Sequence, residues 1–237
     1  MDKTASALAL LREAAHLQPA AFSTSFGAED MVVLDLIRAN ALPIEIFTLD
    51  TGRLPEETYR LMQRVEERYG HCFKTYFPDA SAVQALVERN GTNGFYQSVE
   101  KRKDCCAVRK LEPLARALAG KRAWVTGLRA QQSVTRAGLA PREWDAQWKV
   151  EKFNPLADWT EADVWNYIRS RGVPYNELHD RFYPSIGCAP CTRAITPGED
   201  LRAGRWWWER PESKECGLHT KHRAAAEPQS IAIKEIA

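Results

Sequence analysis

Six cysteines are the residues of this sequence best suited to chemistry, and their spacing is uneven. Four of them form two pairs, the adjacent Cys105 and Cys106 and the CxxC pair of Cys188 and Cys191. We find no secretory signal, so we expect a reducing compartment, in which such thiols bind metal or react instead of forming disulfides. Two pairs of thiols together supply the four ligands of one metal centre.

The adjacent pair distinguishes two kinds of metal centre. A zinc ion needs four ligands that converge on one point, and zinc sites usually space their cysteines by two or more residues. A 4Fe-4S cluster bonds each thiolate to a different iron, which neighbouring cysteines reach more easily. The residues therefore favour one 4Fe-4S cluster on these four cysteines, with a zinc site and structural or redox thiols as the alternatives.

The other two cysteines stand alone in the sequence. Cys216 lies in KECGLH beside Lys214 and His219, and this nearby positive charge favours a reactive thiolate. It is a candidate nucleophile, and its intermediate would need an external reductant such as thioredoxin or glutaredoxin, because no second thiol is paired with it. We interpret Cys72 as a small buried hydrophobic residue.

The loop SFGAED offers an anion site at the start of a predicted helix. Gly27 and the small Ala28 allow a phosphate to approach backbone amides closely. The loop lacks the Gly-Lys-Ser/Thr end of a Walker motif, which disfavours GTPase or ordinary ATPase chemistry. It also lacks an SGG-type run, which disfavours adenylation with release of pyrophosphate. A plain strand-to-helix turn is the alternative interpretation.

Several basic residues are candidates to complete such a site. Arg202 and Arg205 are three residues apart in EDLRAGRWWWER and would face one ligand if this segment were helical. The three tryptophans beside them would form a water-excluding lid or an aromatic contact surface, or would simply pack on the core. Lys110, four residues after the adjacent cysteines, would lie one turn from the metal centre, and Arg129 and Arg136 flank another loop. By default each of these residues is an ordinary solvated cation.

Helices and strands alternate through most of the chain. Apolar periodicity predicts helices over residues 4–17, 29–40, 55–70 and 79–91, a helix that starts near Cys105 and continues through Leu118, and one that follows Thr160. β-Branched and aromatic runs predict strands over residues 20–25, 44–49, 71–77 and 122–125. Such alternation is typical of βαβ units.

These elements predict an α/β fold: a mostly parallel, twisted sheet with helices on both faces, followed by a Cys-rich C-terminal extension. In such sheets ligands bind beyond the carboxyl ends of the strands. SFGAED, DTGRL and the TGLR segment with Gly127 all follow predicted strands, so we expect a nucleotide-sized crevice there. We divide the chain into a nucleotide-binding domain with the metal site, residues 1–214, and a mobile segment with the candidate nucleophile, residues 215–237.

Composition limits what the protein binds. The sequence has 33 Lys and Arg against 31 Asp and Glu, a formal net charge of +2, which argues against a broad nucleic-acid-binding surface. No apolar run approaches the roughly 20 residues that span a bilayer, so we expect no membrane segment. Together with the unpaired thiols, these features predict a cytoplasmic protein.

Taken in order, the motifs resemble those of the assimilatory adenylyl-sulfate (APS) reductases, relatives of the phosphoadenylyl-sulfate (PAPS) reductases. The resemblance extends over nearly the whole chain and rests on SFGAED, LDTGRLPEET, KDCCAVRKLEPL, WVTGLRAQQSVTR, NPLADWTEADVWNYI, VPYNELHD, SIGCAPCTR, GRWWWE and KECGLH. It implies an adenine nucleotide alpha-hydrolase-like fold and one 4Fe-4S cluster per chain. Cys105, Cys106, Cys188 and Cys191 match the family's cluster ligands.

The resemblance also implies a two-stage reaction in sulfate assimilation. The thiolate of Cys216 would attack the sulfur of APS, expel AMP and form an enzyme S-sulfocysteine, from which reduced thioredoxin would release sulfite. Lys110 would lie between the cluster and the substrate. The residues expected to contact the phosphosulfate are Arg136, Arg202 and Arg205, and those of the nucleotide cradle are Ser25, Gly27, Glu29, Leu49, Thr51 and Gly127.

Two alternatives stay open on the sequence alone. PAPS carries one more phosphate than APS, at the 3′ position, and in the family the paired cysteines generally accompany APS use. A protein of another class would use the four cysteines for structural zinc and the Trp-Arg segment to dock a nucleotide or RNA. The sequence leaves the oligomeric state open, a homo-oligomer included.

Overall fold

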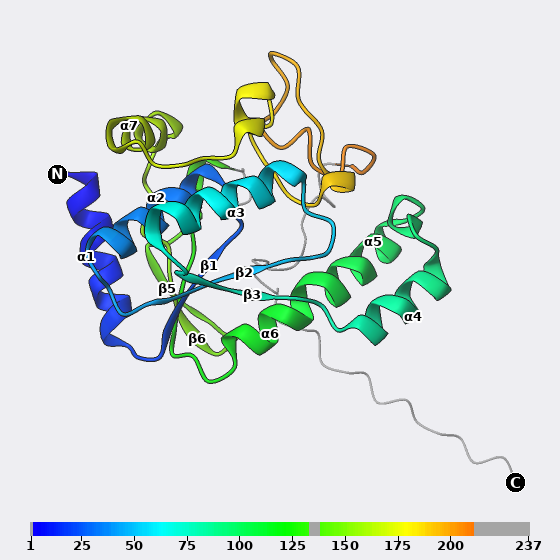
Figure 1. The fold of residues 1–237 in the computed structure, drawn as a ribbon, viewed down its shortest axis with the longest axis horizontal. Helices are drawn as coiled ribbons and strands as arrows, with labels where there is room; N and C mark the ends of the chain where they lie inside the picture. Colours follow the sequence, from blue (N-terminus) through cyan, green and yellow to red (C-terminus); the bar gives the residue numbers. More distant parts are fainter. Residues whose placement is uncertain (1, 133–137, 211–237) are drawn as a thin grey trace, which may run out of the picture.

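The computed structural model of the chain describes residues 2–132 and 138–210. Two predicted site residues, Arg136 and Cys216, therefore lie outside the described residues, and so does the predicted segment 215–237. The described part is a twisted sheet that lies between two groups of helices (Figure 1).

A six-stranded sheet forms the centre of the fold, with the strand order β3-β2-β1-β4-β6-β5. All neighbouring strands are parallel except β5 and β6, which are antiparallel. This arrangement confirms the predicted α/β fold with a mostly parallel sheet. The strands are β1 (Ala20–Thr24), β2 (Glu45–Leu49), β3 (Phe73–Tyr76), β4 (Ala123–Val125), β5 (Arg142–Asp145) and β6 (Val150–Phe153).

Seven α-helices in the described part connect or cover these strands, and most begin and end close to the predicted positions. Local capping explains some of their ends: Asp79 accepts a hydrogen bond from the amide of Ala82, and Thr160 forms a capping box with Asp163. The helices are α1 (Lys3–His16), α2 (Ala28–Ala39), α3 (Glu56–Tyr69), α4 (Ala80–Asn90), α5 (Val99–Cys106), α6 (Glu112–Leu118) and α7 (Glu161–Arg171).

Successive strand residues enter two different hydrophobic cores, because side chains alternate across a sheet. Phe22 and Ile46 belong to the larger core, which α1, α2, α3 and α7 cover. Ala21, Phe47 and Trp124 belong to the smaller core, which α6 covers on the other face (Figure 1). The central strands are thus buried on both faces, which fixes their carboxyl ends relative to one another.

Strands β5 and β6 occupy a stretch to which the sequence analysis assigns no strand. β6 pairs with β4 across the sheet, and β5 then pairs with β6 as an antiparallel edge strand. On that edge the side chain of Trp144 is exposed. Both strands are only four residues long, so pairing with distant residues determines them more than their own pattern.

The prediction that Cys105 and Cys106 start a helix is wrong, because they end α5. A π-helical turn over Ala107–Leu111 follows and leads directly into α6. Pro113, in the first turn of α6, has no amide hydrogen to donate to the preceding turn, which favours a changed hydrogen-bond pattern just before it. The adjacent cysteines therefore lie at the junction of two helical geometries.

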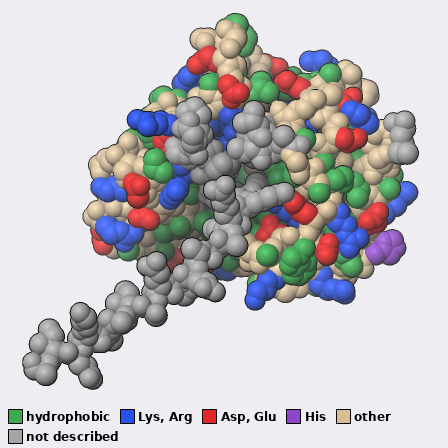
Figure 2. Space-filling model, turned by 180° about the vertical axis from the view of Figure 1, so that it is seen from behind, with side chains coloured by type: hydrophobic (Ala, Val, Ile, Leu, Met, Phe, Trp, Pro, Cys, Tyr) green, Lys and Arg blue, Asp and Glu red, His purple; other side chains and the backbone are tan. Residues whose placement is uncertain are grey.

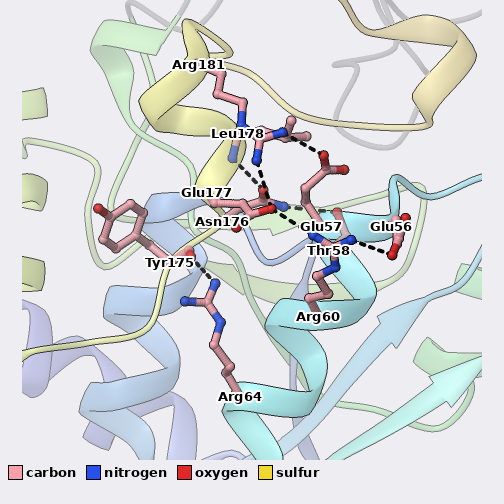
Figure 3. A network of polar contacts seen from close by, with 10 residues as sticks. All are labelled: Glu56, Glu57, Thr58, Arg60, Arg64, Tyr175, Asn176, Glu177, Leu178 and Arg181. Atoms are coloured by element: carbon pink, nitrogen blue, oxygen red, sulfur yellow. Dashed lines mark hydrogen bonds and ion pairs between the residues drawn. The ribbon is translucent and has the colours of Figure 1, made fainter.

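Three arginines at successive turns of α3 hold the segment 172–181, which we call the strap. Figure 3 shows two of them, Arg60 and Arg64. Arg64 donates a 2.6 Å hydrogen bond to the carbonyl of Tyr175. Further contacts along the strap join Arg60 to Glu177, Arg68 to the carbonyls of Arg171 and Gly172, Asn176 to Thr58, and Arg181 to Glu57. The strap is therefore fastened to α3 along its length.

Among the described residues, no helix combines the length and the apolar character needed to cross a bilayer. Acidic and basic side chains are interspersed over the face shown in Figure 2, in line with the net charge of +2. The described side chains on that face form no broad basic field of the kind that a nucleic-acid duplex attracts.

Asp35 joins α2 to α7 through a buried carboxylate that is 2% exposed. It accepts hydrogen bonds from the hydroxyls of Tyr69 at 2.9 Å and Tyr167 at 2.7 Å, and from the Nε of Arg171 at 2.9 Å. Removing the acceptor leaves buried donors without a partner, which is costly.

We predict that Asp35→Ala lowers the free energy of unfolding by about 1–3 kcal/mol, because it leaves the buried Tyr167 hydroxyl without its acceptor. Urea denaturation measures this value. The matched control is Asp158→Ala on the exposed surface, for which we expect a change within about 0.5 kcal/mol. Equal effects of the two substitutions would contradict the role given to Asp35.

Candidate active site

A cleft of about 560 Å³ opens beyond the carboxyl ends of β1, β2 and β4. From β1 the chain continues to β2 and β3 on one side and then crosses to β4 on the other side of β1, so the cleft lies at the point where strand order reverses, the usual ligand position in such sheets. Every predicted substrate contact in the described part lines it: Ser25, Gly27, Glu29, Leu49, Thr51, Lys110, Gly127, Arg202 and Arg205.

Asp30 shapes the loop between β1 and α2, and the sequence analysis did not single it out. Its carboxylate accepts hydrogen bonds from both the amide and the hydroxyl of Ser25, at 2.6 and 2.7 Å. A Cβ at position 127 would overlap this carboxylate, so Gly127 is what allows the two loops to meet. Burial raises the pKa of Asp30 to about 6, although hydrogen bonds from Ser25 lower it.

Arg129 lies beside this loop, in the segment that follows β4, and it is buried rather than solvated. Its Nε lies 2.8 Å from a carboxylate oxygen of Glu29. The negative charge of Glu29 is therefore balanced at the start of α2, where the helix dipole and backbone amides favour an anion. This pairing keeps the β1 loop suitable for a phosphate.

The other end of the cleft is basic. The segment that carries Arg202 and Arg205 consists of turns and not of a helix, yet both side chains line the cleft. Arg205 is buried and donates to the carbonyls of Ile186 at 3.3 Å and Cys191 at 3.4 Å. A Cβ on Gly187 would collide with its guanidinium, so glycine leaves the room that Arg205 needs.

A second, smaller cavity lies behind this basic end, and all four paired cysteines line it. Cys106, Cys188 and Cys191 are buried, and Cys105 packs against the same cluster of apolar side chains. The two pairs, far apart in the sequence, thus meet at one place. No set of three or more Cys, His, Asp or Glu side chains in the described part is arranged to hold a single metal ion.

The surroundings of these thiols differ in charge. Burial raises the pKa of Cys191 to about 12, and the nearby Cys188 adds to this effect. Burial acts in the same direction on Cys188, but Lys110, the Thr51 hydroxyl at 3.2 Å and Arg205 together lower its pKa. Of these two thiols, Cys188 is therefore the one whose ionised form this environment favours.

Lys110 lines both the cleft and the cysteine cavity. It follows the adjacent cysteines in the π-helical turn, and its ammonium is the charge that most favours the Cys188 thiolate. One cation therefore borders both regions.

Trp206 lines both the cleft and the cysteine cavity and is fully buried. The guanidinium carbons of Arg102 and Arg205 each lie 4.7 Å from its ring centroid. Arg102 also forms a two-point ion pair with Glu209, with contacts of 2.8 and 2.7 Å. This buried pair fastens the Trp-Arg segment to α5.

Residues 19–194 match a family model described as the phosphoadenosine phosphosulfate reductase domain. The matched region contains both cysteine pairs and all three loops of the cleft. The chain belongs to this family.

Relatives with known names agree over nearly the full chain. The adenosine 5′-phosphosulfate reductase of Allochromatium vinosum is 59% identical over 229 residues, 96% of this chain and 90% of that protein. The adenosine 5′-phosphosulfate reductase of Burkholderia cepacia is 57% identical over 198 residues, 84% of this chain and 79% of its own.

Solved structures agree on the fold. The phosphoadenylyl-sulfate (PAPS) reductase of Candida auris, determined as a phosphate complex, has a TM-score of 0.68 at 29% identity over 80% of this chain and 90% of that one. The FMN adenylyltransferase of Candida glabrata, with a TM-score of 0.55 at 18% identity, covers 98% of this chain and 78% of its own, and shares the fold alone.

Asp30 makes stability depend on pH in a defined direction. Because its pKa is about 6 in the folded chain against an ordinary 3.8, the folded state binds more protons than the unfolded state between about pH 4 and 6. Ionisation of Asp30 therefore costs stability as the pH rises through this window.

We predict that Asp30→Asn removes this cost. Relative to the variant, the wild type should lose free energy of unfolding between pH 4 and 6.5, by roughly 1.4 kcal/mol per pH unit at most. Urea titrations at several pH values measure the difference. Curves that stay parallel over this range would contradict the assignment.

Proposed function

We propose that this protein reduces adenosine 5′-phosphosulfate (APS) to sulfite and AMP in sulfate assimilation. The support is 59% identity over 96% of the chain with a relative named for this substrate. The cleft adds to it, since its basic end adjoins a cavity lined by two cysteine pairs.

The nucleotide would lie along the cleft with its phosphosulfate at the basic end. Leu49, Thr51 and Gly127 border the part next to the strand ends, and the β1 loop offers Ser25 and backbone amides to the phosphate. Arg202 and Arg205 would hold the sulfate oxygens, because guanidinium groups match tetrahedral oxyanions. The two arginines would mainly orient the sulfate and stabilise its negative charge.

Cys216 would be the nucleophile, on the evidence of the KECGLH motif alone. Its thiolate attacks the sulfur of APS, an S–S bond forms, and the S–O bond to AMP breaks, which leaves an S-sulfocysteine. A thiolate of reduced thioredoxin or glutaredoxin then attacks Cys216 and expels sulfite, and its second thiol restores the Cys216 thiolate. The dithiol is oxidised to a disulfide, and the transferred sulfur gains two electrons.

The four cysteines at the small cavity fit a 4Fe-4S cluster by donor chemistry, because they supply four thiols from two sides. Cys105, Cys106, Cys188 and Cys191 would be the ligands. When bound, the cluster would supply charge and a structural link and would carry no electrons in this reaction. Lys110, which borders both cavities, would place its ammonium between cluster and sulfate.

We further propose a cytoplasmic location, since this chemistry needs free thiols and a reducing partner. Residues 1–214 would bind the nucleotide and the cluster, and residues 215–237 would carry the nucleophile.

PAPS is the second candidate substrate, favoured by the likeness to the PAPS reductase of Candida auris. We predict that kcat/KM for sulfite formation with thioredoxin is at least about tenfold higher for APS than for PAPS, a difference of about 1.4 kcal/mol. Steady-state assays with both nucleotides measure this ratio. A preference for PAPS would overturn the substrate assignment.

We predict that Cys216→Ser abolishes sulfite formation and keeps APS binding, because the hydroxyl is a far weaker nucleophile and the cleft residues stay intact. Equilibrium binding of APS and a sulfite assay measure the two properties. Anaerobic purification supplies the control: wild type and variant should both be brown and contain equal iron.

Three results would count against these assignments. A Cys216→Ser variant that turns over excludes the nucleophile. A colourless wild-type protein with stoichiometric zinc excludes the cluster. Loss of APS binding in the variant would give Cys216 a structural role.

A further inference from the structure

Three consecutive tryptophans occupy three different environments. Trp206 is 1% exposed beneath two guanidinium groups. Trp208 is half-buried and packs on Phe95 and Tyr96, with ring centroids 6.3 and 4.5 Å apart. Trp207, between them, is 39% exposed and is not among the described residues that line the cleft or the cysteine cavity. Trp207 therefore has no role in the proposed reaction.

Trp207 belongs to an exposed group that we call the aromatic patch, made of Tyr96, Pro190 and Trp207. The Tyr96 and Trp207 ring centroids are 6.2 Å apart, and Tyr96 is 40% exposed. The Tyr96 hydroxyl donates a 2.7 Å hydrogen bond to the carbonyl of Pro190, inside the CxxC loop. Tryptophan and tyrosine side chains are enriched in protein interfaces.

The length of chain beyond the patch limits where Cys216 can be. Arg210 is the last residue before the undescribed segment, and Cys216 follows six positions later. Six residues span at most roughly 22 Å, so the Cα atom of Cys216 always lies within that distance of the Cα atom of Arg210. Trp207 is only three residues before Arg210. A protein whose thiol attacks Cys216 is therefore held close enough to contact the surface around Trp207.

We propose that the aromatic patch docks the dithiol protein that releases sulfite from Cys216. The inference rests on the proposed function and adds the place where the reductant binds. The occupant is a small folded dithiol protein of the thioredoxin class, since a protein must cover a flat exposed surface while its thiolate reaches the S-sulfocysteine. That thiolate forms the S–S bond to Cys216 as the S–S bond to sulfite breaks.

The test compares two reductants on the full chain with its metal centre. In Trp207→Ser we expect kcat/KM for thioredoxin to fall at least about tenfold, because a buried interface tryptophan typically acts as a hot spot. The rate with dithiothreitol, which needs no docking surface, should not change. AMP release in a single turnover without reductant, which reports only attack by Cys216, should also stay the same.

The chain supplies matched controls in two other exposed aromatic residues. Phe77 and Trp144 are 57% and 59% exposed and lie outside both cavities. Phe77→Ser and Trp144→Ser should keep the wild-type kcat/KM for thioredoxin. Trp207→Phe should recover most of the loss, since it restores a flat apolar ring. Unchanged visible absorption of each variant would verify that the metal centre is intact.

Three outcomes would overturn the proposal. Trp207→Ser with wild-type kcat/KM for thioredoxin shows that the patch does not dock the reductant. If the rate with dithiothreitol falls by the same factor, or if AMP release becomes slower, then Trp207 serves the chain's own segment after Arg210. A loss shared by the Phe77 and Trp144 controls shows a general surface effect. Failure of the proposed function itself looks different, because the wild type then forms no sulfite from APS with either reductant.

Discussion

One antiparallel bridge between Thr192 and Arg205 holds the functional parts of the molecule together. It joins the end of the CxxC loop to the Trp-Arg segment through two hydrogen bonds, from the Trp206 amide to the carbonyl of Cys191 and from the Arg193 amide to the carbonyl of Gly204. The bridge places Arg205 at the cleft and Trp206 at the cysteine cavity, and the Arg102–Glu209 ion pair holds the same segment against α5. Two hydrogen bonds that involve no cofactor thus help to set the geometry between the basic end of the cleft and the four thiols.

Much of the fold could be predicted, because helices and buried strands have local patterns. The capped helices α4 and α7 and the strands β1 to β4 follow directly from periodicity and capping residues. β5 and β6 could not be predicted, since they depend on pairing with residues far along the chain. The helix boundary at Cys106 was wrong because a π-helical turn has no sequence signature as clear as an N-cap.

The site likewise contains residues that could be predicted from the sequence and residues that could not. Loops at strand ends and paired cysteines are visible in a sequence, so the residues that meet at the cleft could be chosen from their motifs. Asp30, the burial of Arg129 and the pairing of Arg102 with Glu209 could not, because Asp30 packs against Gly127, and Arg129 and Arg102 pair with carboxylates about a hundred residues away along the chain. A net charge of +2 also hides this arrangement, since the residues at the basic end of the cleft are few and are wholly or partly buried.

The π-helical turn over Ala107–Leu111 sets the rotation of one helix relative to the next. An α-helix advances by about 100° per residue, so one residue more or fewer in this turn would rotate the two cysteines by about that angle relative to α6. α6 is anchored in the core through Leu114 and Leu118, so the cysteines would move and α6 would keep its position. The length of this turn is therefore as strict a requirement as the identity of the cysteines, and a survey of natural variants should find substitutions there but no insertions or deletions.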